Sequence, residues 1–272
     1  MGTVTSFTLM AVAGRAILKE INTFELMLYR SVIGFLIVSF FVARSKRGFA
    51  QLKTADPIQH LLRATVHFTG QNLWFFAIAV IPLAQLTALE FTNPLWVALL
   101  APLMLGETLT RKKFLVVLLG FVGVIIVARP GVEPVSLGHI AGIIAALGFA
   151  VTNIITRRIT RRDSVLCLLF WMTLVQSFLS LGLSLPGGIP WPEAHLWPWV
   201  IIMGITGLSA HFCLSQALSL APATIVAPMD FLRLPLSAVV GVALYQEPLL
   251  VTVFIGGGVI LVANYLNLRQ KS

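Results

Sequence analysis

Four ionisable residues lie inside long apolar stretches of the chain: Arg30, Glu90, Asp230 and Arg233. A charged side chain at the centre of a membrane helix costs about 2.5–3.5 kcal/mol, so such residues are expected to face protein, water or substrate. Their formal charges sum to zero, which indicates pairing. We predict that they contact a charged or zwitterionic substrate, carry a proton, or form permanent salt bridges between helices.

The depth of these residues limits which of them can meet. At a rise of 1.5 Å per residue, Arg30 lies roughly 8 Å and Glu90 roughly 10 Å from the same membrane face. These two could therefore meet, although Arg30 is shallow enough to snorkel towards the interface instead. Asp230 and Arg233 are three residues apart and share a helix face. The sequence thus offers two candidate pairs.

A polar stripe runs along the third apolar segment, where His67, Gln71 and Trp74 are spaced at i, i+4 and i+7. Polar groups on one stripe should face protein or water and not lipid. At an offset of 140 residues Gln71 corresponds to His211, so two equivalent positions are polar. We predict a substrate cavity here, in which a histidine is also suited to relay protons. The alternative is interhelical hydrogen bonding, worth about 0.6 kcal/mol on average.

Two further cavity candidates are Trp171, as an aromatic wall, and Gln216; a tryptophan is also typical of the membrane interface. Cys167 and Cys213 fall inside apolar segments without zinc-type spacing, so neither a disulfide between them nor a metal site is expected. No catalytic residue or cofactor is expected either. The predicted cavity residues are Arg30, His67, Gln71, Trp74, Glu90, Trp171, His211, Gln216, Asp230 and Arg233.

Apolar segments of membrane-spanning length carry these residues. Hydrophobic residues make up 58% of the 272 residues and charged residues 11%, against about 25% in soluble domains. Segments near the ~20 residues that a bilayer span needs recur from end to end. The gaps are too short for a soluble domain, so residues 1–272 are predicted to form one all-α membrane domain. The ten predicted spans are 3–19, 25–43, 60–80, 83–104, 113–129, 137–157, 165–185, 196–220, 222–245 and 249–268.

The basic residues predict the orientation of the spans. They cluster after spans 2, 4, 6 and 10, so one membrane face collects them, and that face should be cytoplasmic with both termini. This juxtamembrane placement argues against nucleic acid as the partner of the net charge of +9. The first span lacks a preceding basic residue and is interrupted by Arg15, unlike a signal peptide. Whether the natural N-terminus is complete stays open. The clusters comprise Arg44, Lys46, Arg47, Lys53, Arg111, Lys112, Lys113, Arg157, Arg158, Arg161, Arg162, Arg269 and Lys271.

Residues 82–107 and 222–247 read alike at a constant offset of 140 residues. The match joins spans 4 and 9, which are five crossings apart, and an odd number of crossings inverts the second copy. The predicted fold is therefore ten transmembrane helices in a 5+5 inverted repeat, 1–131 and 132–272, around a central cavity at mid-bilayer.

Other repeated residues are predicted to be structural. Glu107 and Glu247 each end a span, and a carboxylate at that point favours the positive end of the following helix. Prolines should kink spans 4 and 9 beside the cavity, either as gate hinges or for packing against a neighbouring helix. They are Pro94, Pro102, Pro228 and Pro235. Small residues in spans 5 and 10 permit close helix packing, within the chain or across a dimer. These glycines are Gly120, Gly123, Gly256, Gly257 and Gly258.

With these features the chain resembles the drug/metabolite transporter superfamily, in its EamA-like branch. The resemblance rests on the ten spans and on two copies of a pattern. The copies are IPLAQLTALEFTNPLWVALLAPLMLGE (81–107) with GFVGVIIVARPG (120–131), and LAPATIVAPMDFLRLPLSAVVGVALYQEP (220–248) with GGGVILVAN (256–264). It implies a cavity lined by spans 1–4 and 6–9, with spans 5 and 10 outside as support or a homodimer face. It further implies a secondary transporter of the bacterial inner membrane that exports or exchanges small metabolites, with amino acids the first expectation.

Other functions remain alternatives. A facilitative channel or an uptake carrier for another polar metabolite would also use a membrane domain of this kind. An intramembrane enzyme is disfavoured, because the chain has no HExxH helix, GxSxG elbow or phosphate-binding glycine loop. The substrate, the net direction, the oligomeric state and the choice between proton coupling, exchange and facilitated diffusion stay open.

Overall fold

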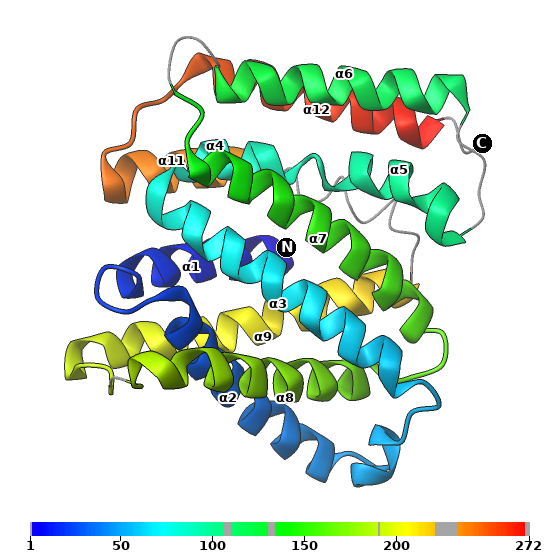
Figure 1. Ribbon diagram of the computed structural model, residues 1–272, viewed down its shortest axis with the longest axis vertical. Helices are drawn as coiled ribbons and strands as arrows, with labels where there is room; N and C mark the ends of the chain where they lie inside the picture. The colour runs from blue at the N-terminus through cyan, green and yellow to red at the C-terminus, as the bar shows by residue number, and fades with distance from the viewer. Residues whose placement is uncertain (1, 106–109, 130–133, 190, 221–232, 270–272) are drawn as a thin grey trace. The chain divides into compact units, whose positions relative to one another are not determined.

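The computed structural model describes residues 2–105, 110–129, 134–189, 191–220 and 233–269 (Figure 1). Every regular element in these residues is a helix, and no strand is assigned there. The chain forms two compact units, each with segments from both halves of the sequence. Unit 1 is Met1–Phe75 with Ile155–Ala221, and unit 2 is Phe76–Ile154 with Pro222–Ser272. The units are therefore not the two sequence repeats, because each contains parts of both.

Unit 1 is built around α2, which starts at a capping box. The Asn22 side chain accepts hydrogen bonds from the backbone N–H groups of Phe24 and Glu25, and the Glu25 carboxylate accepts from the Asn22 N–H at 3.0 Å. Helix α2 packs along α8 and α9. The helices of the unit are α1 (Gly2–Ile17), α2 (Thr23–Arg44), η1 (Gly48–Leu52), α3 (Pro57–Val80) up to residue 75, the end of α7 (Leu137–Ile159), α8 (Val165–Ser184), η2 (Leu185–Gly187), η3 (Ala194–Leu196) and α9 (Trp197–Leu220).

Unit 2 contains a broken helix and one very close helix pair. The break between α4 and α5 lies at residues 91–92, just before Pro94, whose ring nitrogen cannot donate the hydrogen bond that would continue α4. Helices α6 and α12 run side by side (Figure 1), and a Cβ on Gly123 would lie 2.7 Å from the Gly256 carbonyl oxygen. The predicted close packing of these glycines within the chain is confirmed. The helices are α4 (Leu83–Glu90), α5 (Asn93–Leu105), α6 (Arg111–Ala128), most of α7, α11 (Arg233–Tyr245) and α12 (Val251–Arg269).

The starts of the helices repeat along the chain. Helix α3 begins at residue 57 and α9 at residue 197, a shift of 140. The same shift relates the start of α6, at 111, to the start of α12, at 251. Helices at equivalent positions of the two halves also pack together, α2 with α8 in unit 1 and α6 with α12 in unit 2. The sequence repeat therefore has a counterpart in helix position and packing.

Four of the described helical segments are long and apolar enough to cross a membrane: Thr23–Arg44, Leu137–Ile159, Val165–Gly187 and Ala194–Leu220. Each of the other six predicted spans contains a helix that is shorter, broken or more polar. The predicted span 83–104 is divided between α4 and α5, and the predicted span 222–245 is described only from residue 233. Ten crossings in a 5+5 arrangement remain a prediction.

Candidate functional site

The core of unit 1 contains a buried polar cluster, here called the unit 1 cluster. Its members come from α2, α3, α8 and α9, and at most 5% of each is exposed. An apolar bundle core excludes such groups unless they bond to one another or to a ligand. The unit 1 cluster comprises Arg30, Arg63, His67, Gln71, Gln176 and His211.

Gln176 connects Arg30 to His67. Its amide oxygen accepts a hydrogen bond from Arg30 Nη1 at 3.5 Å, and its amide nitrogen lies 2.7 Å from His67 Nδ1. Because the amide nitrogen can only donate, Nδ1 is the acceptor, which assigns the His67 ring proton to Nε2. His67 is therefore a neutral imidazole in this arrangement.

His67 and His211 join α3 to α9. Their rings meet edge to face, with centroids 4.5 Å apart and planes at 82°, and Phe7 covers the other side of His211 at 5.5 Å. Within the described part of the chain, His211 Nε2 is buried and has no hydrogen-bond partner. A buried polar atom of this kind costs about 1–3 kcal/mol, so it is available to a ligand or a water molecule.

Arg30 and Arg63 are buried cations that no described carboxylate neutralises. Among the described residues, the hydrogen-bond acceptors of Arg30 Nη1 are the Gln176 amide oxygen and, at 3.8 Å, the Met27 thioether. Arg63 Nε donates to Thr156 Oγ1 at 3.0 Å, and its Nη1 has no partner among the described residues. The formal charge of the unit 1 cluster is therefore +2, a strong attraction for an anionic group.

The Arg30 guanidinium is positioned by a close approach to α9. A Cβ on Gly207 would lie 2.6 Å from Arg30 Nε and 3.2 Å from Nη2. Glycine is required here because any larger residue would displace the guanidinium. The position of Arg30 therefore depends on Gly207 and Gln176 together.

Unit 2 buries an ion pair at its helix break. Arg233 Nη1 lies 2.8 Å from Glu90 Oε2, and the two side chains are 7% and 9% exposed. Glu90 is the last residue of α4, and Arg233 is the first described residue of α11. Asn264 Nδ2 donates to the Phe91 carbonyl oxygen at 2.9 Å, which satisfies an acceptor freed by the break. Broken helices with polar ends are typical of binding sites in secondary transporters.

These contacts add a pair that the sequence did not suggest. Glu90 pairs with Arg233 within unit 2. Arg30 bonds to the amide of Gln176. Asp230, the other expected partner of Arg233, lies outside the described residues.

The predicted stripe on α3 is buried in protein, as expected. His67, Gln71 and Trp74 are each at most 3% exposed. Gln71 Nε2 makes a weak contact with the Met10 thioether at 4.0 Å, and Trp74 packs edge to face on Phe75 at 5.0 Å. The stripe joins three of the predicted residues to Arg30 and His211 in one unit.

Trp171 and Gln216 do not reach the unit 1 cluster. Trp171 Nε1 donates to the Leu52 carbonyl oxygen at 3.2 Å, and its ring centroid lies 6.0 Å from that of His60. Gln216 is exposed and accepts a hydrogen bond from Ser219 at 3.4 Å. Their cavity roles remain predictions.

Sequence reasoning missed two members of the unit 1 cluster. Arg63 lies four residues before His67, so extending the α3 stripe by one turn would have included it. Gln176 is the only glutamine in the apolar helix α8, and a lone amide in such a helix indicates a buried partner.

Comparison with known proteins assigns the chain to a family. The model of the EamA-like transporter family matches residues 1–129 and 136–269. The S-adenosylmethionine uptake transporter of Rickettsia prowazekii is 27% identical over 228 residues, covering 84% of this chain and 76% of that protein. The riboflavin transporter of Brucella anthropi is 26% identical over 230 residues, covering 83% and 81%. A crystal structure with 18% sequence identity superposes with a TM-score of 0.68 over 100% of this chain and 99% of the other, which shows a shared fold. The chain therefore belongs to the EamA-like transporter family, within the drug/metabolite transporter superfamily that its sequence resembles, and is a multi-pass membrane transporter.

Proposed function

We propose that the protein is a secondary transporter that moves a small metabolite bearing a carboxylate across the bacterial inner membrane by alternating access. The observation that carries this proposal is the buried Arg30, which has no carboxylate partner among the described residues. Burial of one charge in a membrane helix costs about 2.5–3.5 kcal/mol. A substrate carboxylate that pairs with Arg30 would offset that cost during part of each transport cycle.

The chemistry of Arg30 favours a carboxylate over a neutral ligand. Its planar guanidinium can donate two parallel hydrogen bonds to a carboxylate, which adds geometric selectivity to the charge attraction. S-adenosylmethionine and free amino acids carry this group next to an ammonium, whereas riboflavin carries no ionised group at neutral pH. Among the ligands that the relatives' names suggest, we therefore propose S-adenosylmethionine first and riboflavin second.

The proposed direction is uptake, with exchange as the alternative. The S-adenosylmethionine transporters among the relatives are named for uptake, and neither of the relatives described above is named for amino acid export. The export of amino acids expected from the sequence therefore lacks support from these names. Amino acids remain candidate substrates because they share the carboxylate and the ammonium.

The proposed architecture is the 5+5 inverted repeat with both termini cytoplasmic. Two observations support it: the family model matches one segment in each half, and α3 and α9 begin 140 residues apart. Labelling of single cysteines in intact cells, one in the 44–56 loop and one in the 186–195 loop, tests the orientation. The proposal requires the first to be accessible only from the cytoplasm and the second only from outside.

The substrate proposal is tested by counterflow in liposomes. Purified protein is reconstituted, and labelled S-adenosylmethionine, methionine and riboflavin are supplied outside vesicles loaded with the same unlabelled compound. We expect saturable counterflow of S-adenosylmethionine, its loss in Arg30→Met and its partial retention in Arg30→Lys. Counterflow of riboflavin alone, unaffected by either variant, would remove the carboxylate proposal and leave the family assignment intact. A non-saturating flux would favour a channel.

A second experiment tests whether a proton gradient drives transport. Glu90 is the described acid nearest to a helix break, and its Oε2 lies 2.8 Å from Arg233 Nη1. An imposed pH gradient should accelerate net uptake if a proton accompanies the substrate. Equal rates with and without the gradient would indicate exchange or facilitated diffusion.

A further inference from the structure

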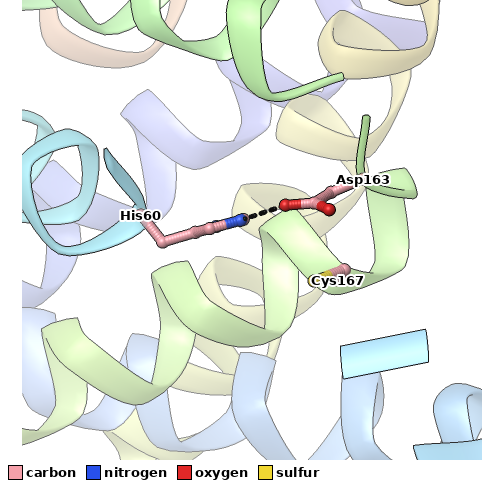
Figure 2. Close-up of side chains that lie close together, drawn as sticks. All are labelled: His60, Asp163 and Cys167. Atoms are coloured by element: carbon pink, nitrogen blue, oxygen red, sulfur yellow. Dashed lines mark hydrogen bonds and ion pairs between the residues drawn. The ribbon is translucent and has the colours of Figure 1, made fainter. Parts of the chain in front are cut away.

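Three side chains with metal-ligand chemistry meet at one end of unit 1. His60 lies in the first turn of α3, Asp163 in the connection between α7 and α8, and Cys167 in the first turn of α8. One ligand atom of each lies within 4.8 Å of the other two. Figure 2 shows the His60 ring directed at the Asp163 carboxylate, with the Cys167 side chain beside that carboxylate. We propose that His60, Asp163 and Cys167 form a binding site for Zn²⁺.

The ligand types select for zinc. Zn²⁺ binds imidazole nitrogen, thiolate sulfur and carboxylate oxygen, whereas Mg²⁺ and Ca²⁺ take oxygen ligands. Three protein ligands and one water complete its tetrahedral coordination. The carboxylate and the thiolate together carry the two negative charges that balance one Zn²⁺, so the complex is neutral.

Two hydrogen atoms must move when the ion binds. His60 Nε2 now lies 2.8 Å from Asp163 Oδ2, and a proton occupies that contact. His60 Nδ1 is buried without a hydrogen-bond partner in the described structure, so it can hold the proton once Nε2 turns to the metal. The Cys167 thiol releases its proton to solvent as the S–Zn bond forms. Binding therefore releases one proton per ion.

Neighbouring groups already hold the ligands in place. Thr54 Oγ1 donates to Asp163 Oδ2 at 2.6 Å. The Leu52 carbonyl oxygen lies 3.8 Å from Cys167 Sγ and also accepts from Trp171 Nε1. Such outer contacts orient metal ligands, and their removal typically lowers metal affinity by roughly 10–100-fold. This gives Trp171, which lies apart from the unit 1 cluster, a place in the surroundings of the proposed metal site.

A surface cavity gives the ion a route to the buried ligands. The cavity has a volume of about 260 Å³, and Asp163 lines it together with Thr54, Asp56 and Gln59. His60 and Cys167 are buried behind Asp163. Arg158, Arg161 and Arg162 also line this cavity, and they slow the approach of a free cation.

Co²⁺ as a spectroscopic substitute for Zn²⁺ tests the site. Purified full-length protein is freed of metal with a chelator and titrated with Co²⁺. We expect one equivalent to bind with the near-ultraviolet absorption of a cobalt–thiolate bond, and Zn²⁺ to displace it. Cys167→Ser should remove that absorption, and Cys213→Ser, which changes the other cysteine, should keep it. Thr54→Val should lower the affinity by roughly 10–100-fold.

Other variants separate this site from a second cluster and from misfolding. Glu20, Glu193 and His195 form an exposed group that contains no thiol. Asp163→Asn, at a partly exposed position, should abolish the rise in melting temperature that Zn²⁺ causes, and His195→Ala should keep that rise. Absence of the cobalt–thiolate band in the native protein, its survival in Cys167→Ser, or loss of binding in His195→Ala alone would overturn the proposal. A stabilisation by inorganic phosphate or phosphatidylglycerol vesicles without any by Zn²⁺ would also overturn it.

Discussion

In unit 1 two buried arginines face an amide, a hydroxyl and a thioether, whereas in unit 2 a buried arginine faces a carboxylate. The described contacts of Arg30 and Arg63 leave a formal charge of +2 in the core of unit 1. In unit 2, Arg233 and Glu90 bring opposite charges to 2.8 Å. Both arrangements are buried to the same degree, so burial alone does not distinguish them.

The two units differ in whether the described protein residues supply a counter-charge for the buried arginine. The pair of Glu90 and Arg233 brings opposite charges together, so breaking it should affect folding before it affects binding. The buried cations of unit 1 have no counter-charge among the described residues, and an anion that binds there would neutralise one of them. We therefore propose that unit 1 recognises the substrate carboxylate and that the pair in unit 2 is mainly structural.

The largest expected effect is that of breaking the pair in unit 2. Glu90→Gln removes the charge that faces Arg233 Nη1, and loss of one partner of a buried pair typically costs about 3–5 kcal/mol. The measurement is the unfolding of the detergent-solubilised protein, by melting temperature and by denaturant. The double variant Glu90→Leu/Arg233→Met should recover most of the lost stability, because apolar replacement of a buried pair is often neutral. A double variant less stable than Glu90→Gln would contradict the structural assignment.

Removal of the unbalanced cation in unit 1 should change the stability of the protein in the opposite direction. Arg30→Met deletes a charge whose membrane burial costs about 2.5–3.5 kcal/mol, so the variant should be at least as stable as the native protein. The same variant should lose both counterflow and the stabilisation by S-adenosylmethionine. If Arg30→Met destabilises the protein as much as Glu90→Gln does, the two units do not differ in the way described.

A smaller effect is expected from moving Arg30 without changing its charge. Gly207→Ala places a Cβ 2.6 Å from the present position of Arg30 Nε. Such overpacking of a core typically costs about 1–3 kcal/mol. The guanidinium should shift, which raises the KM for the carboxylate substrate more than it lowers the maximal rate. Gly182→Ala in α8 is the matched control, because a Cβ there meets nothing within 4 Å. Equal kinetics for the two variants would show that the position of Arg30 is not set by α9.

The features predicted correctly from sequence depend on nearby residues. The break before α5 follows from Pro94, and the burial of the α3 stripe follows from the spacing of His67, Gln71 and Trp74. The all-α class follows in the same way, because the apolar segments that predict helices are continuous, whereas the ten spans in a 5+5 repeat remain a prediction. These are properties of single helices, which residues three or four positions apart determine.

The contacts that sequence could not predict join residues far apart in the chain. Gln176 binds His67 across 109 positions, and Asp163 binds His60 across 103. Such contacts depend on which helices pack together. Periodicity within one helix carries no information about its neighbours. For the same reason depth alone gave no indication that Arg233 lies 2.8 Å from Glu90.

The smallest expected effect sharpens the comparison within unit 2. Glu247 was expected to stabilise the start of α12, but its Oε2 accepts a hydrogen bond from the Leu83 N–H at 2.9 Å, at the start of α4. Pro82, the N-cap of α4, offers no side-chain acceptor, so Glu247 supplies one from the other half of the chain. Loss of a helix cap costs about 1 kcal/mol, and Glu247→Ala should lower the free energy of unfolding by that amount.

Two variants separate the hydrogen bond from the charge of Glu247. Glu247→Gln keeps an acceptor and loses the favourable interaction with the helix dipole, so it should cost about 0.3–1 kcal/mol, less than Glu247→Ala. Gly241→Ala should resemble Glu247→Ala, because a Cβ at Gly241 would collide with Glu247 Oε2. The described polar contacts would then show one pattern: acids in unit 2 are satisfied by the protein, Glu90 by Arg233 and Glu247 by α4. Retention of full stability in Glu247→Ala would break that pattern and reduce the contrast with unit 1 to the single pair Glu90–Arg233.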